Sequence, residues 1–319
     1  MSVEQWEQYY RAGALATGPV GADGSYDLEV RTLWQDFFTA LPKSSRLLDV
    51  ATGNGVVASI ALATSRDQAL DLEIHGSDLA RIQPLIDVHD SAERLQGIHF
   101  HPGVATQALP MEDATFNAVC GQYALEYSPI QPALSEIFRV LKPGGMVLFV
   151  VHHNDSVLIR NAKNSLREGH IVLSECNLYR CLHALLSLEN ATPELAQSFA
   201  APLQKSIRNV KTAYAEAFQV GSGQIAQIAL DATQTLLKLH GQMPPAVLGR
   251  EVDRAERELQ EAIQRVRDLI EVAQDAEGMA RIQEIAVTLG FSDPEVSLVH
   301  HAVSNVVGWK FIISKPSDG

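Results

Sequence analysis

Asp49 and the turn that follows it have the residue types and spacing best suited to binding a ligand. Residues 47–55 read Leu-Leu-Asp-Val-Ala-Thr-Gly-Asn-Gly, and residues 56–63 are rich in Ala, Val and Ile. An apolar strand, a turn containing Gly53 and Gly55, and a helix are expected in that order. Glycine lets a bound molecule come close to the backbone of such a turn. The turn lacks both the G-x-G-x-x-G spacing of dinucleotide-binding proteins and the Lys-Ser/Thr ending of a phosphate-binding loop.

Polar side chains also follow further segments that are expected to be strands. Asp78, residues 104–111 and Gln122 each come at or shortly after the end of such a segment. Open parallel sheets bind ligands outside the carboxyl ends of their strands. We therefore expect these positions to surround one site together with the Asp49 turn. The expected parallel strands cover residues 46–50, 72–76, 97–101, 116–121 and 146–151.

Helical segments separate these strands, and the alternation indicates the fold class. Residues 55–64, 80–95 and 130–141 are expected to be helices. The strand segments are apolar runs without strict alternation, which favours a parallel sheet covered on both faces. Residues 295–302 and 307–314 are close enough in sequence to form an antiparallel hairpin at the sheet edge. The sequence thus predicts an α/β fold whose mostly parallel sheet ends in a C-terminal hairpin.

A long helical block interrupts this pattern. Residues 155–275 carry apolar faces at helical spacing. Residues 252–273 repeat apolar positions in alternating steps of three and four, which suits packing against another helix of the chain or of a second subunit. We expect an N-terminal helical lid segment, an α/β cofactor-binding domain and an inserted helical cap or dimerisation subdomain. They cover residues 1–45, residues 46–154 with 276–319, and residues 155–275.

Composition limits the classes of partner and location. The chain has 319 residues and a formal net charge of −13, and an acidic surface disfavours nucleic acid partners because it repels phosphates. No apolar run is long enough to span a membrane, and residues 1–6 do not read as a signal peptide. The cysteines lack the spacing of a metal site, which predicts free thiols, a cytoplasmic location and no bound metal. They are Cys120, Cys176 and Cys181.

The Asp49 turn resembles the first motif of class I S-adenosylmethionine-dependent methyltransferases. Its form, Asp-Val-Ala-Thr-Gly-x-Gly, is common in the branch resembling the ubiquinone/menaquinone methyltransferases. Later motifs of that family have counterparts in the same order at residues 75–79, 104–117 and 120–127. The resemblance covers residues 30–154 and 280–316. It implies a Rossmann-like methyltransferase sheet, an enzyme, and S-adenosylmethionine as cofactor.

The resemblance also implies how the cofactor is held. Its methionine part would lie against the turn, with Asp49 near its amino group. Asp78 would accept the two ribose hydroxyls, and Leu79 would lie against the adenine. The implied cofactor-binding residues are Asp49, Ala51, Thr52, Gly53, Asn54, Gly55, Asp78, Leu79, Ala105, Thr106 and Gln122.

The chain departs from the family pattern at three positions. Ala51 stands where the family most often has its first Gly, and Ala105 and Asn117 stand where acidic residues are usual. Adenine contacts are therefore expected from backbone groups near Ala105 and Thr106. A role for Asp78 as a helix N-cap is the structural alternative to its binding role.

Catalysis of methyl transfer would need little chemistry from the protein. The acceptor must be aligned with the methyl group and sulfur, and a general base is needed only when the nucleophile is protonated. His152 and His153 follow the fifth strand and are candidates for that base, although strand capping or packing would suit both equally. Tyr123 and Tyr127 are candidates for shaping the acceptor pocket, or are buried structural aromatics. We take His152, His153 and Tyr123 as the candidate catalytic residues.

Two further regions would complete such a site. Tyr9, Tyr10 and Tyr26 form an aromatic group that would belong to the N-terminal lid over the cofactor. The helical block at residues 155–275 is too long for a simple connection. We expect it to determine acceptor specificity and to offer a surface for homodimerisation.

The leading functional hypothesis is an S-adenosylmethionine-dependent methyltransferase acting on a small organic acceptor at O, N or C. A protein or RNA methyltransferase is the second reading, and the acidic charge disfavours RNA. A third is a methyltransferase-like scaffold that binds a ligand or partner without catalysis, which the substitutions at Ala105 and Asn117 would suit. A nicotinamide dehydrogenase is disfavoured by the glycine pattern of the first turn.

Overall fold

The computed structural model describes residues 3–13, 28–189, 192–292, 294–301 and 305–317. The chain forms two compact units, the first made of Met1–Leu158 with Val272–Gly319 and the second of Ile159–Glu271. The first unit is an α/β structure and the second is helical.

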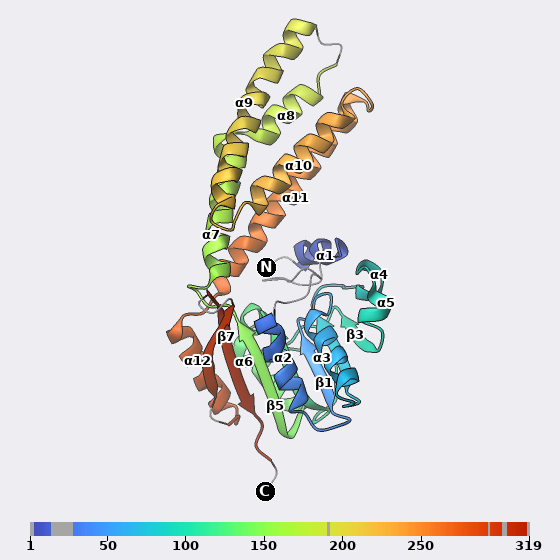
Figure 1. Ribbon diagram of the computed structural model, residues 1–319, viewed down its shortest axis with the longest axis vertical. Helices are drawn as coiled ribbons and strands as arrows, with labels where there is room; N and C mark the ends of the chain where they lie inside the picture. Colours follow the sequence, from blue (N-terminus) through green and yellow to red (C-terminus); the bar gives the residue numbers. More distant parts are fainter. Residues whose placement is uncertain (1–2, 14–27, 190–191, 293, 302–304, 318–319) are drawn as a thin grey trace. The chain divides into compact units, whose positions relative to one another are not determined.

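A seven-stranded sheet in the order β3-β2-β1-β4-β5-β7-β6 forms the centre of the first unit (Figure 1). β1 to β5 are parallel, β7 is antiparallel to β5, and β6 is antiparallel to β7. The strands are β1 (Arg46–Val50), β2 (Glu73–Asp78), β3 (Ile98–Pro102), β4 (Phe116–Gln122), β5 (Leu141–Val151), β6 (Glu295–His301) and β7 (Asn305–Ser314). The predicted mostly parallel sheet with a C-terminal antiparallel hairpin is confirmed.

Helices pack on both faces of the sheet, as the apolar strands require. On one face, α2 (Leu28–Thr39) and α3 (Val56–Asp67) form a core with the sheet that includes the fully buried Trp34 and Phe38. On the other, α6 (Ile130–Val140) and α12 (Ala276–Thr288) pack in a second core. Burial of these apolar faces holds the carboxyl ends of the strands in fixed register.

The helix expected over residues 80–95 is wrong. Two single-turn helices take its place, α4 (Pro84–Asp87) and α5 (Ser91–Arg94). Proline disfavours a helical conformation in the residue before it, so α4 begins at Pro84. Asp90, between the two helices, has a φ of 58°, and this left-handed conformation ends any continuous helix.

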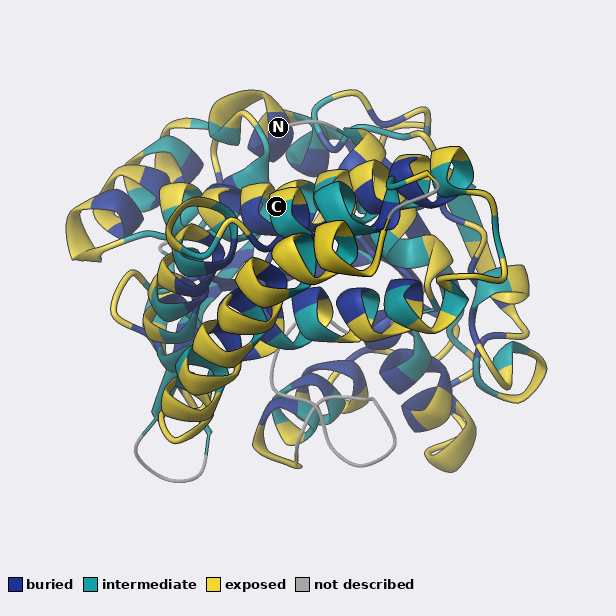
Figure 2. Cartoon of the chain, turned by 90° about the horizontal axis from the view of Figure 1, so that it is seen from above, coloured by how far each residue is buried: buried dark blue, intermediate teal, exposed yellow. Residues whose placement is uncertain are grey.

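The second unit is built from helices around a core of its own. Helices of both units are buried along one side and exposed along the other (Figure 2). Val252, Leu259 and Ala262, from the repeat seen in the sequence, are buried in this core. No described helix combines the length and apolar character needed to cross a bilayer. The helices of this block are α7 (Val157–His170), a π-helical turn (Ile171–Glu175), α8 (Leu178–Leu186), α9 (Pro193–Phe218), α10 (Gln224–Leu239) and α11 (Pro245–Val272).

Candidate functional site

The turn between β1 and α3 is held in a conformation that ordinary residues avoid. Ala51, Gly53 and Gly55 have φ values of 50°, 54° and 86°. Glycine adopts this left-handed conformation without steric strain, whereas the β-carbon of Ala51 makes it unfavourable. The turn is tied to the neighbouring strand because the Thr52 N–H donates to the Ser77 carbonyl at 2.9 Å. A backbone of this shape directs its N–H and C=O groups to the carboxyl edge of the sheet.

The Asp49 side chain stabilises the turn. This side chain is buried, Oδ2 accepts a 2.6 Å hydrogen bond from the Thr52 hydroxyl, and Oδ1 lies 3.8 Å from the donating Cys120 thiol. Burial raises the pKa of Asp49 to about 7, against the opposing effect of the Thr52 hydrogen bond. In the structure, its contacts are thus with the turn, α3 and β4.

Asp78, at the end of β2, joins the second strand to the same turn. Its Oδ2 accepts the Gly53 N–H at 2.8 Å, and its Oδ1 accepts the Ala80 N–H at 2.8 Å. Burial raises the pKa of Asp78 to about 6 although both hydrogen bonds favour the charged form. Each carboxylate oxygen has a second lone pair, so the group can still accept hydroxyl protons from a ligand.

The next segments continue this edge of the sheet. Leu79 follows Asp78 and is 49% exposed. The Val104 N–H donates to the Asp78 carbonyl at 2.8 Å, which holds the segment containing Ala105 and the buried Thr106 next to β2. An apolar side chain and backbone polar groups therefore lie on either side of the Asp78 position.

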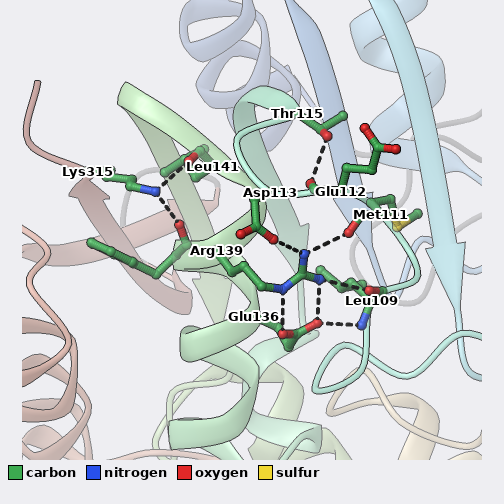
Figure 3. A network of polar contacts seen from close by, with 10 residues as sticks. Leu109, Met111, Glu112, Asp113, Thr115, Glu136, Arg139, Leu141 and Lys315 are labelled. Atoms are coloured by element: carbon green, nitrogen blue, oxygen red, sulfur yellow. Dashed lines mark hydrogen bonds and ion pairs between the residues drawn. The ribbon is translucent and has the colours of Figure 1, made fainter. Parts of the chain in front are cut away.

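Arg139 on α6 fixes the loop that leads from this segment to β4 (Figure 3). Its guanidinium binds Glu136 through Nε at 2.8 Å and donates to the carbonyls of Leu109 and Met111 at 2.9 Å and 2.8 Å. A further bond of 2.7 Å reaches Asp113. The planar fork of an arginine suits such a multidentate role. The glutamate and aspartate partners raise the pKa of Arg139 further above its ordinary value.

Helix α1 (Val3–Arg11) lies over the turn. The Asn54 side-chain amide donates to the Tyr10 carbonyl at 2.9 Å. The Tyr10 ring is so close to Gly53 that a β-carbon there would come within 2.7 Å of its Cε1 atom. Tyr9 and Tyr10 form the aromatic group expected at the N-terminus, together with Trp6. Tyr26, the third tyrosine of that prediction, is outside the described residues.

Gln122 and Tyr123 begin the second half of the site, at the end of β4. Gln122 is buried, and its Oε1 accepts a 2.6 Å hydrogen bond from the Trp34 indole of α2. Its amide nitrogen has no hydrogen-bond partner among the described residues. Tyr123 has a φ of 54° and donates its hydroxyl proton to the Val307 carbonyl at 3.1 Å. A strained non-glycine residue at a strand end is often part of a functional site.

His152 stacks on Tyr123, with ring centroids 3.8 Å apart and ring planes within 3° of parallel. Burial lowers the pKa of His152 to about 3, so its ring is neutral at ordinary pH. Its backbone N–H donates to Glu126 Oε1 at 2.6 Å. Glu126 belongs to a 3₁₀ turn (Leu125–Tyr127), and burial raises its pKa to about 7. The structure thus brings together Tyr123, His152 and a glutamate that the sequence interpretation had not singled out.

His153 has different surroundings from its neighbour. Its ring stacks on Trp309 at 4.5 Å, and its Nδ1 accepts the Asp155 N–H at 2.9 Å. Its backbone pairs with Gln274, where the first unit resumes after the helical block. The two adjacent histidines are therefore not equivalent, and only His152 contacts Tyr123 and Glu126 among the described residues.

Glu126 could have been noticed from its sequence context. It stands among Leu125, Tyr127 and other residues of an apolar and aromatic segment directly after a buried strand. A carboxylate in such a segment is either paired or has a shifted pKa. The described residues contain no group of three or more His, Cys, Asp or Glu side chains suited to a metal ion.

A family model described as "Methyltransferase domain" matches residues 25–186 of the chain. The match includes both halves of the site, from the Asp49 turn to His153. The chain belongs to the methyltransferase-domain family. This membership confirms the resemblance on which the cofactor prediction rests.

Sequence relatives of this methyltransferase-domain chain include two quinone-pathway enzymes. The ubiquinone/menaquinone biosynthesis C-methyltransferase of Brucella anthropi is 36% identical over 124 residues, covering 36% of this chain and 46% of the relative. The demethylmenaquinone methyltransferase of Thermus thermophilus is 32% identical over 111 residues, covering 34% and 48%. The chain thus spans about half the length of the curated relatives it matches.

Solved structures of similar fold include a 1,6-didemethyltoxoflavin-N1-methyltransferase of Burkholderia thailandensis, with bound 1,6-didemethyltoxoflavin and S-adenosylhomocysteine. It is 17% identical in sequence, with a TM-score of 0.32 and coverage of 40% of this chain and 54% of that one.

Proposed function

We propose that this protein is an S-adenosylmethionine-dependent methyltransferase that transfers a methyl group to a small organic acceptor. The observation that carries the proposal is the Asp78 carboxylate, which links the end of β2 to the backbone of the Gly53 turn. That arrangement offers hydroxyl-accepting oxygens beside a glycine-containing turn, within a chain of the methyltransferase-domain family.

The residues on this edge fit the donor molecule by their chemistry. The turn residues Ala51 to Gly55 would hold its methionine part, with Asp49 beneath them. Asp78 would accept the ribose hydroxyls, while Leu79 and the backbone of Ala105 and Thr106 would contact adenine. Gln122 would contact the donor through its unpaired amide nitrogen. When bound, S-adenosylmethionine supplies a methyl group activated by a cationic sulfur.

The second half of the site would receive the acceptor. His152, Tyr123 and His153 remain the predicted catalytic residues, and the contact of His152 with Tyr123 supports placing these two at the acceptor. Helix α1, with Tyr9 and Tyr10, would act as the lid. The relatives' names describe C-methyl transfer in ubiquinone and menaquinone biosynthesis, which supports a small-molecule acceptor here. The alternative acceptors, a protein or RNA, have no such support.

We also propose a cytoplasmic location, supported by three free cysteines. The helical block would determine acceptor specificity. Homodimerisation through its 252–273 repeat has weaker support, because Val252, Leu259 and Ala262 are already buried in the unit's own core.

Calorimetric titration with S-adenosylhomocysteine tests the donor site directly. We expect one binding site per chain, with an affinity that S-adenosylmethionine shares. Incubation with S-adenosylmethionine and a panel of small hydroxylated, amine and carbon-acid acceptors should then produce S-adenosylhomocysteine. Binding without turnover on any acceptor would favour the non-catalytic scaffold. Absence of binding would refute the donor assignment.

A further inference from the structure

Buried polar atoms without partners gather on one side of the site. Glu126 Oε2, His152 Nδ1 and Trp6 Nε1 are buried and have no hydrogen-bond partner among the described residues. Ring contacts connect them, since the Tyr127 centroid lies 6.0 Å from that of Trp6 and 6.0 Å from that of His152. Folded proteins seldom leave such atoms unpaired, because burial without a hydrogen bond costs free energy. These atoms are therefore arranged for a molecule that binds among them.

Among the residues that the structure describes, Glu126 is the only carboxyl group of this cluster, and no salt bridge balances its charge. In the described part of the chain, no lysine, arginine or histidine forms a salt bridge with Glu126. The nearby His152 ring is neutral because burial lowers its pKa to about 3. The other titratable side chains in ring contact with the cluster are those of Tyr123 and Tyr127.

The backbone gives this carboxyl group a fixed direction. The His152 N–H holds Oε1 at 2.6 Å, so the unpartnered Oε2 is the oxygen left for a ligand. The N–H groups of Ala124 and Glu126 favour the charged form of Glu126 without completing a hydrogen bond to Oε2. Burial outweighs them and raises the pKa to about 7, which suits proton transfer near neutral pH.

We propose that Glu126 is the proton acceptor of the methyl-transfer reaction and that the acceptor molecule presents a weakly acidic hydroxyl group to it. The inference rests on the proposed function. His152 is the positioning residue, because its backbone N–H orients the carboxylate and its stacked ring forms one wall beside it.

A hydroxyl group matches the unpaired atoms better than an amine does. An alcohol or phenol can donate its proton to Glu126 Oε2, and an oxygen of the same molecule can accept from the Trp6 indole, which is a donor only. An ammonium group would pair with the carboxylate but would leave that indole N–H without an acceptor. The surrounding rings of Trp6, Tyr123 and Tyr127 suit a flat, largely apolar molecule that carries the hydroxyl.

The charges balance over the whole step. The O–H bond breaks and its proton goes to Glu126 Oε2. The electron pair freed by the hydroxyl, on oxygen or on a conjugated carbon, forms the new bond to the methyl carbon. The carbon–sulfur bond breaks and leaves its pair on sulfur. A sulfonium cation and a carboxylate anion are thereby replaced by a neutral thioether and a neutral carboxylic acid. A buried site of low polarity favours a step that separates no charge.

Infrared spectroscopy and ligand binding with the full chain test the assignment. Subtracting the spectrum of Glu126→Gln from that of the wild-type protein, both saturated with S-adenosylhomocysteine, should leave a protonated-carboxyl band that disappears between pH 6 and pH 8. Asp49 and Asp78, whose pKa values burial also raises, contribute equally to both spectra and cancel. A matched control, Glu112→Gln, changes an exposed glutamate, and its difference from the wild-type spectrum should contain no carboxyl band that disappears between pH 6 and pH 8. A wild-type minus Glu126→Gln difference spectrum without this band would overturn the assignment.

The acceptor class is tested with two small probes. 4-Nitrophenol should bind the wild-type complex with S-adenosylhomocysteine at least tenfold more tightly than the Glu126→Gln complex. 4-Nitroanisole, which lacks the hydroxyl proton, should bind both proteins equally. An equal loss of affinity for both probes in Glu126→Gln, or no binding of 4-nitrophenol to the wild-type complex, would refute a hydroxyl-binding role. S-Adenosylhomocysteine affinity should be the same in all variants. If it binds none of them, the proposed function fails, and the infrared difference between wild type and Glu126→Gln, recorded without ligand, still tests the ionisation of Glu126.

Discussion

The two halves of the sheet edge differ in how their polar groups are satisfied. On the β1–β2 side, both oxygens of Asp49 and both oxygens of Asp78 already accept hydrogen bonds from the chain. On the β4–β5 side, Glu126 and His152 each keep a buried atom without a partner in the described structure. The two carboxylates of the first side are thus satisfied before a ligand arrives, whereas the second side keeps buried polar atoms for a ligand.

This difference suits two ligands with different demands. A donor molecule common to many enzymes can be bound by a rigid frame of backbone and carboxylate groups. An acceptor must be distinguished from similar molecules. Unpaired buried groups make this distinction, because a ligand that forms no hydrogen bonds with them leaves the free-energy cost of their burial in place. The comparison predicts that removing a carboxylate on the first side damages donor binding and folding together, whereas removing the Glu126 carboxylate on the second side separates them.

The largest effect is expected from Asp78→Ala. The change removes the acceptor of the Gly53 and Ala80 N–H groups and the proposed acceptor of the ribose hydroxyls. Hydrogen bonds to a charged group contribute about 1.5–3 kcal/mol each, so S-adenosylhomocysteine affinity should fall roughly 100-fold or more. Calorimetry measures the affinity, and circular dichroism checks that the fold is retained.

The control for Asp78→Ala is Asp67→Ala, which removes an exposed carboxylate at the end of α3. The affinity of Asp67→Ala for S-adenosylhomocysteine should match that of the wild type. Unchanged binding in Asp78→Ala would remove this residue from the donor site and with it the main support for the proposed function.

Arg139→Ala should have the next largest effect, through the loop between β3 and β4. The change breaks the contacts to Glu136, Asp113 and two loop carbonyls. The arginine side chain is 31% exposed, so solvent weakens these bonds, and we expect a loss of about 1–3 kcal/mol of unfolding free energy. Urea denaturation measures this loss. Arg139→Lys should recover only part of it because lysine lacks the planar fork; full recovery would contradict the multidentate role.

The order of elements and the first half of the site were predictable because their signals are local. Gly53 and Gly55 mark the turn, Asp49 and Asp78 end short apolar strands, and each signal spans only a few residues. Residues 80–95 show the limit of such reasoning. Their helical pattern is overruled by Pro84 and by the left-handed Asp90, which split the segment into two short helices.

The second half depends on contacts that no short segment encodes. The hydrogen bond between Trp34 and Gln122 joins residues 88 positions apart, and that between Tyr123 and Val307 joins residues 184 positions apart. The isolation of Glu126 is likewise a property of everything packed around it. Sequence patterns placed Tyr123 and His152 at this edge, but the missing counter-charge of Glu126 is visible only in the folded chain.

Glu126→Gln should separate stability from donor binding on the second side. A folded-state pKa raised from 4.5 to about 7 means that the unfolded chain releases this proton first. The favourable contribution of Glu126 is therefore complete below about pH 4.5 and is lost as the pH rises through 7. The difference in unfolding free energy between Glu126→Gln and the wild type should therefore shift in favour of Glu126→Gln by on the order of 1–3 kcal/mol as the pH rises from 5 to 8.

Urea denaturation at several pH values provides this comparison. The amide introduced by Glu126→Gln cannot titrate, so the change of the stability difference with pH isolates the carboxyl group. Asp49 and Asp78 also have raised pKa values, but they contribute equally to both proteins. A stability difference that stays constant from pH 5 to pH 8 would mean that Glu126 does not ionise in this range.

The smallest effect is expected on the first side, from Ala51→Gly. Ala51 adopts a φ of 50°, and this left-handed conformation costs an L-residue about 1–2 kcal/mol. Glycine removes that strain but adds about 0.5–1 kcal/mol of unfolded-state entropy. A net gain of about 0.5–1 kcal/mol in unfolding free energy is expected, with unchanged S-adenosylhomocysteine affinity. Ala40→Gly, at an exposed position of ordinary φ, should lose stability instead. A loss of unfolding free energy in Ala51→Gly as large as that in Ala40→Gly would show that Ala51 adopts its conformation without strain. The backbone of the first side would then be less rigidly fixed than that of the second.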